Sequence, residues 1–126
     1  MPAYALAHLY DPKPHPEVIE YIERVQATLD PYGGRFVAHG PQVEVAEGEW
    51  PGTIVIVEFP SLEEALAWYA SPAYQEILPL RTRNIRGTAI IFDGVGPEYD
   101  AAGKAAEMRA LLAAIDQQAE ATPGAA

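Results

Sequence analysis

The sequence has 126 residues, no cysteine, and 18 acidic against 8 basic residues, which gives a formal net charge of -10. An acidic chain repels the phosphates of nucleic acid, and the lack of cysteine excludes disulfides, thiolate metal sites and a thiol nucleophile. No run approaches the ~18 apolar residues that span a bilayer, and no secretory signal is visible, so we expect a cytoplasmic protein without nucleic-acid or membrane partners.

The first third of the chain predicts a strand, a loop and a helix. Residues 3–10 alternate small and large side chains, as in a β-strand with two distinct faces. Residues 11–16 form a proline-rich loop, and Pro16 suits the first turn of a helix. That helix carries an apolar stripe at steps of four, three and four residues: Val18, Ile22, Val25 and Leu29. Asp30-Pro31 is expected to end it before a glycine turn.

The middle of the chain predicts two strands. Residues 35–46 read as a strand that Gly40 and Pro41 interrupt as a bulge or kink. Residues 53–59 follow a turn-rich connection and are apolar on both faces, which is typical of a strand that is covered on both sides.

The next segments predict helices and a last strand. Ser61 and Glu64 form a capping box, which opens a helix. A short second helix is expected to begin at Ser71 and to stop at Pro79. Residues 87–93 predict the last strand.

This order of elements predicts an α+β fold, a ferredoxin-like βαββαβ antiparallel sheet with helices on one face. We expect residues 1–96 to form this domain and residues 97–126 to form an extra C-terminal helix with a flexible tail. The second face of the sheet is also apolar and needs a cover. A homodimer that stacks sheet on sheet is the favoured cover, and the C-terminal helix folding back is the alternative.

Four segments resemble a known family: Gly33-Gly34-Arg35, EGEWPGTIVIVEFPSLEEALAWY, SPAYQEILPLR and a strand ending in Asp93-Gly94. Over about residues 2–95 they are similar to the domain-of-unknown-function family thirteen-thirty, in the dimeric α/β-barrel superfamily of ferredoxin-like proteins. The resemblance implies the fold and a homodimer. It leaves the chemistry open, because the superfamily includes cofactor-independent monooxygenases, chlorite dismutase relatives and ligand-binding modules.

Two histidines are candidate proton-transfer groups. His39 follows Val37 on one strand face, and His8 shares a strand face with Tyr4 and Tyr10. If these faces point toward the helices, both imidazoles line a cavity between sheet and helices and can exchange protons near neutral pH. The alternative is a histidine that is hydrogen-bonded at a strand end. The histidines lack metal-ligand spacing, so we expect no metal site.

Arg81, Arg83 and Arg86 bring three of the eight basic residues into six positions. They form either a solvated loop or an anchor for an acidic group. Arg81 and Tyr74 lie in segments shared with the family, so they are candidates to close the pocket and hold an acidic group. They are seven residues apart, or two helical turns, although Pro79 is expected to break that geometry.

Three further side chains have open roles. Trp50 and Trp68 fit either core or interface packing or ligand stacking, and Trp50 is kept as a candidate ligand-binding residue. Glu58 is either a solvent-exposed residue at a strand end or a pocket carboxylate.

Two functions from different classes follow. The first is a small-molecule-binding protein or cofactor-independent enzyme that acts on a small organic acid or carbonyl compound. Its catalytic group is His39, and its ligand-binding residues are Arg81, Tyr74, His8 and Trp50. The second is a non-catalytic homodimeric structural or interaction module. A closed apolar cavity in which those side chains converge favours the first, and a filled core favours the second.

Overall fold

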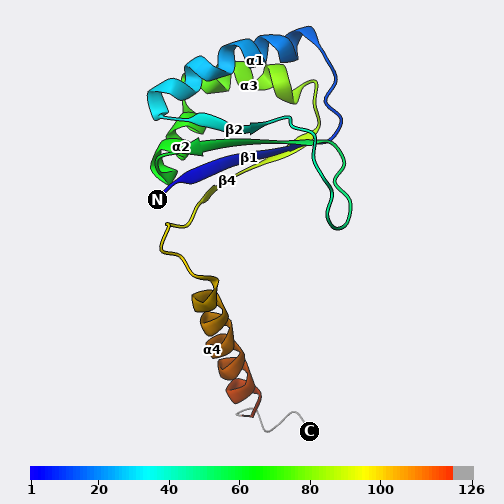
Figure 1. Ribbon diagram of the computed structural model, residues 1–126. Helices are drawn as coiled ribbons and strands as arrows, with labels where there is room; N and C mark the ends of the chain where they lie inside the picture. The colour runs from blue at the N-terminus through cyan, green and yellow to red at the C-terminus, as the bar shows by residue number, and fades with distance from the viewer. Residues whose placement is uncertain (121–126) are drawn as a thin grey trace. The chain divides into compact units, whose positions relative to one another are not determined.

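The protein has the expected strand, helix, strand, strand, helix, strand order, as the computed structural model shows for residues 1–120 (Figure 1). The strands form one antiparallel sheet in the order β2-β3-β1-β4, and α1, α2 and α3 cover one of its faces. The elements are β1 (Ala3–Leu9), α1 (Pro16–Leu29), the 3₁₀ turn η1 (Asp30–Tyr32), β2 (Arg35–His39), β3 (Thr53–Phe59), α2 (Leu62–Ala70), α3 (Pro72–Thr82), β4 (Gly87–Asp93) and α4 (Ala101–Glu120).

The register of the sheet divides its residues between a helix face and an open face. Ala3 and Leu9 of β1 are buried under the helices, so the alternate residues Ala5 and Ala7 share the helix face. The intervening residues and their partners on β3 and β4 form the open face: Tyr4, Leu6, His8, Ile54, Ile56, Glu58, Thr88, Ile90 and Phe92. Ile90 is 51% exposed on that face.

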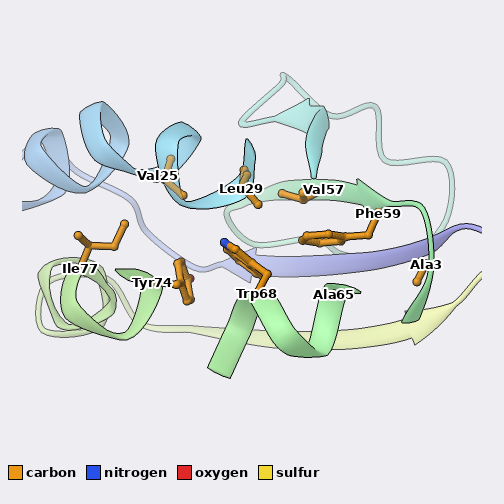
Figure 2. Close-up of a cluster of buried hydrophobic side chains, with 9 residues drawn as sticks. All are labelled: Ala3, Val25, Leu29, Val57, Phe59, Ala65, Trp68, Tyr74 and Ile77. Atoms are coloured by element: carbon orange, nitrogen blue, oxygen red, sulfur yellow. The ribbon is translucent and has the colours of Figure 1, made fainter. Parts of the chain in front are cut away.

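The core lies between the helix face and the three helices (Figure 2). Trp68 of α2 fits between sheet and helices, and its indole Nε1 donates a hydrogen bond of 3.0 Å to the Thr28 hydroxyl of α1. The turn after α1 needs glycine, because a Cβ on Gly34 would lie 2.8 Å from side-chain carbons of Leu29 and Phe59. The glycine turn that the sequence predicted is therefore also a close-packing position.

Several local expectations are confirmed. Pro16 begins α1, and Ser61 caps α2 by accepting a hydrogen bond of 3.4 Å from the Glu64 amide. The predicted burial of the α1 stripe is wrong at one residue, because Ile22 is 47% exposed.

Two predicted boundaries are wrong. The second strand ends at His39 instead of continuing to residue 46, and a loop of residues 40–52 connects it to β3. Helix α3 does not stop at Pro79 but continues to Thr82. Proline removes one hydrogen bond from a helix interior, but α3 packs against α1 and buries Tyr74 and Ile77, and this packing offsets the loss.

The chain divides into two compact units, Met1–Val95 and Gly96–Ala126. The second unit contains the predicted C-terminal helix, α4, whose apolar side chains are exposed: Met108, Leu111, Leu112 and Ile115. Within residues 1–120, no helix combines the length and the apolar character needed to cross a membrane.

We predict that deletion of residues 97–126 leaves the sheet domain folded. Every residue of the described core clusters lies before residue 97, so the deletion removes none of the core. Circular dichroism of the shortened chain should show a cooperative thermal transition. A shortened chain without a cooperative transition would show that α4 belongs to the core.

Candidate functional site

A cavity of about 640 Å³ lies between the helix face of the sheet and the helices. Its size is in the range of small-molecule sites. The floor is hollow because alanine occupies successive helix-face positions of β1, Ala5 and Ala7, and Ala89 of β4 pairs with Ala7. The small side chains that the sequence shows in alternation along the first strand thus create the space.

Aromatic rings form much of the cavity wall. Phe36 comes from β2, Trp68 and Tyr69 from α2, Tyr74 from α3 and Tyr21 from α1. The Trp68 and Tyr74 ring centroids are 4.0 Å apart, and Figure 2 shows these two side chains next to each other. Such a wall favours a ligand with a flat, apolar body.

Two tyrosines place a hydrogen-bonded hydroxyl pair at this wall. The hydroxyl oxygens of Tyr21 and Tyr74 are 2.8 Å apart. Burial raises the pKa of Tyr21, and the neighbouring Tyr74 raises it further. Tyr21 therefore keeps its proton in neutral solution and can donate a hydrogen bond.

Arg81 brings a positive charge to the same cavity. Because α3 continues through Pro79, Arg81 lies two turns after Tyr74 and on the same side of the helix. Its guanidinium carbon is 5.6 Å from the ring centroid of Tyr21. Burial alone lowers the pKa of Arg81, but the neighbouring Tyr21 and Tyr74 raise it overall, so the guanidinium stays charged.

Among residues 1–120, Arg81 has no carboxylate partner. Other arginines of the domain do: Arg24 pairs with Glu20 and Glu76, Arg35 with Glu58, and Arg83 with Glu17. No aspartate or glutamate of the described chain lines the cavity. In an acidic protein this leaves one half-buried cation in an apolar cavity without a counter-ion.

His39 also lines the cavity, from the end of β2. It pairs with Val55 on the helix face, and its ring stacks on Phe36 at a centroid distance of 4.3 Å. The imidazole is exposed and has no hydrogen-bonding protein partner within the described residues. Its ring nitrogens are therefore open to a hydrogen bond with a ligand or with solvent.

The cavity excludes the other two predicted ligand-binding residues, His8 and Trp50. His8 lies on the open face, where its ring stacks on Trp50 at 4.0 Å and its Nε2 lies in hydrogen-bonding distance of the Pro51 carbonyl. Of the two histidines, His39 thus lies on the helix face, as the cavity hypothesis required, and His8 does not. The reason is the two-residue period of β1, which sends His8 to the face opposite Ala7.

The sequence matches the family described as Domain of unknown function (DUF1330) over residues 2–95. The chain belongs to this family. Among curated proteins, none matches the sequence.

Several solved structures are similar to this DUF1330 protein, and two of them are described as ferredoxin-like. A protein of unknown function from Rhodopseudomonas palustris is 18% identical, with 76% of this chain and 84% of that chain covered and a TM-score of 0.58. A dimeric ferredoxin-like protein of unknown function from Jannaschia sp. CCS1 is 14% identical, with coverage of 75% and 100% and a TM-score of 0.52. The cofactor-independent oxygenase SnoaB from Streptomyces nogalater, solved as a variant, is 12% identical, with coverage of 79% and 98% and a TM-score of 0.54.

The arginine cluster of the DUF1330 sequence does not act as one group. Arg83 contacts Glu17 at the surface, and its hydrogen bond, together with that from Asn84, lowers the pKa of Glu17. Arg86 lies over the ring of Tyr10, 5.2 Å from its centroid. Only Arg81 of the three lines the cavity.

Two other side chains of the DUF1330 domain are placed by the structure. Glu58 lies on the open face and binds Arg35 at 3.0 Å, so it is no cavity carboxylate. Tyr21 lines the cavity, although the sequence reasoning did not select it. Its position was accessible from helical spacing, because Tyr21 lies three residues after Val18 and four before Val25, both of which are buried.

The described residues contain no group of three or more histidine or acidic side chains placed to hold a metal ion.

Proposed function

We propose that this DUF1330 protein binds a small organic acid or carbonyl compound in the cavity, and that His39 transfers a proton on the bound molecule without a cofactor. The observation that carries the proposal is the guanidinium of Arg81, which lines the cavity without a carboxylate partner in the described chain. A buried cation is costly unless it is paired, and an arginine fork binds a carboxylate through two parallel hydrogen bonds. A ligand oxygen that carries negative charge supplies the missing partner.

His39 fits the role of the proton-transfer group because its imidazole lines the cavity, where its ring stacks on Phe36. On a carbonyl ligand, it takes a proton from the carbon next to the carbonyl. The electron pair of the broken C–H bond moves into a C=C bond, and the carbonyl oxygen becomes an enolate that Arg81 stabilises. Where the ligand carries a C=C bond between its β and γ carbons, the proton returns to the γ carbon and the double bond moves next to the carbonyl, an isomerisation that consumes no oxidant. SnoaB, a cofactor-independent oxygenase of similar fold, is an example of catalysis without a cofactor on such a scaffold.

The binding proposal predicts that organic acids stabilise the wild type and that Arg81→Met abolishes this stabilisation. The measurement is the melting temperature in the presence of carboxylic acids and of their matched neutral amides. Arg86→Met is the control, because it removes the same charge from a residue outside the cavity. Acids that stabilise Arg81→Met as much as wild type would rule out Arg81 as the anchor.

A second proposal concerns assembly, and the open face of the sheet favours it. Ile90 and Phe92 are 51% and 39% exposed there, and Leu6 and Ile56 lie beside them in the register. An apolar sheet face of this kind marks an interface. We propose that a second copy of the chain covers it and forms a homodimer, as the dimeric Jannaschia protein of the same fold suggests. If the cavity binds no ligand, this interface supports the alternative function, a non-catalytic homodimeric module.

A further inference from the structure

The hydroxyls of Tyr21 and Tyr74 form one hydrogen bond with each other, which leaves one of their two O–H donors unused. Each phenol carries one O–H donor, and the contact between the two oxygens, 2.8 Å apart, consumes one of them. The other hydroxyl keeps a donor for which the described residues offer no second acceptor. Tyr74 is only 2% exposed, so its environment supplies little solvent to this pair. A donor in such a setting favours an acceptor inside the cavity.

The guanidinium of Arg81 lies beside this donor. Its carbon is 5.6 Å from the Tyr21 ring centroid, so the ring restricts where the cation can lie. The hydroxyls and the guanidinium all line the same cavity. One helix, α1, provides the ring and a hydroxyl, and the facing helix, α3, provides the second hydroxyl and the charge.

We propose that Tyr21, Tyr74 and Arg81 together bind a single oxyanion, and that the cavity selects flat, apolar monocarboxylates over neutral amides and over dicarboxylates. This inference rests on the proposed function and names the ligand class of the same site. Arg81 supplies the charge and the paired donors, and the free phenol proton supplies a further hydrogen bond to the same carboxylate. Tyr21 is thus a specificity-determining residue, and it also positions the guanidinium.

The rest of the cavity sets the shape and the charge of the ligand. Its floor of Ala5, Ala7 and Ala89 and its aromatic wall accommodate a flat ring system. Within the described chain, Arg81 is the only lysine or arginine that lines the cavity. A second carboxylate would therefore enter an apolar region at the cost of its hydration.

The experiment measures dissociation constants by calorimetry at pH 8, above the usual titration range of imidazole. The probes are 2-naphthoate, 2-naphthamide and naphthalene-2,6-dicarboxylate, tested on wild type, Tyr21→Phe and Arg81→Met. Tyr69→Phe is the matched control, because Tyr69 lines the same cavity but its hydroxyl lies outside the hydrogen-bonded pair. Thermal melts confirm that each variant is folded.

We expect wild type to bind naphthoate at least about 10-fold more tightly than the amide or the dicarboxylate. Tyr21→Phe should weaken naphthoate binding by about 10- to 100-fold and amide binding by less, because a hydrogen bond to a charged group is the stronger one. Tyr69→Phe should leave both nearly unchanged.

The outcomes separate the inference from the proposed function. If Arg81→Met removes naphthoate binding but Tyr21→Phe weakens it no more than Tyr69→Phe does, the tyrosine site is wrong and the arginine anchor stands. If wild type does not bind naphthoate, or does not prefer it to the amide, the anchor and the tyrosine site are both wrong. Equal binding of the dicarboxylate overturns the monoanion selectivity.

Discussion

Replacement of Ile56 with aspartate is expected to convert the protein from a dimer to a monomer that remains folded. Ile56 lies on the open face, where it pairs with Leu6 of β1. In a homodimer that stacks these faces, each aspartate would bury an unpaired carboxylate. Two-fold symmetry would place two such charges in one interface. The dissociation constant should rise by at least about 100-fold, or ~2.7 kcal/mol. Light scattering at micromolar concentration should give twice the chain mass for wild type and the chain mass for the variant.

A matched control separates interface burial from the general effect of a surface charge. Leu66 of α2 is 51% exposed and lies on a helix, away from the open face. Leu66→Asp should therefore keep the mass of the wild type. A monomeric wild type, or an Ile56→Asp variant that stays dimeric, would contradict the interface. The neighbouring change Val55→Asp should behave differently, because Val55 faces the cavity and an aspartate there destabilises the domain itself.

The sequence predicted the sheet domain well because several local signals agreed. The apolar stripe of α1, the Ser61 cap of α2 and the alternation in β1 each fix one element with little help from tertiary contacts. The predictions that failed depended on contacts between elements. Pro79 is a strong local stop signal, yet the packing of α3 on α1, which buries Tyr74 and Ile77, overrides it. The short length of β2 likewise reflects which residues find a partner on β3.

The candidate site was predicted in part. The proposed anchors Arg81 and Tyr74 and the proposed base His39 line one cavity, because α3 persists and His39 lies on the helix face. His8 depended on which of two strand faces is covered, and alternation alone cannot distinguish them. Tyr21 was missed because the predicted apolar stripe of the first helix contained its neighbour Ile22 instead. A tyrosine ring can pack on a buried helix face as an apolar side chain does, so the sequence does not mark Tyr21 as a site residue. Its role becomes visible only in the structure, where its hydroxyl lies beside that of Tyr74.

The cavity itself is the feature that separates a ligand-binding protein from a module with a filled core. Alanine occupies the cavity floor on β1 and β4, and the space above it has a volume of about 640 Å³. Space of this kind forfeits packing contacts, and a larger side chain there would gain them. We infer that a ligand supplies those contacts when it is bound.

Replacement of Ala7 with phenylalanine is therefore expected to abolish ligand binding while the domain stays folded. Ala7 lies on the cavity floor between Val55 and Ala89, so the new ring occupies the place of the ligand body. Affinity for 2-naphthoate should fall by at least about 100-fold, or ~2.7 kcal/mol. The melting temperature should be kept or raised, because burying a phenylalanine ring contributes about 1.5–3 kcal/mol. Ala67→Phe on the exposed side of α2 is the control and should bind as wild type does. A folded Ala7→Phe variant with unchanged affinity would show that ligands bind elsewhere on the protein.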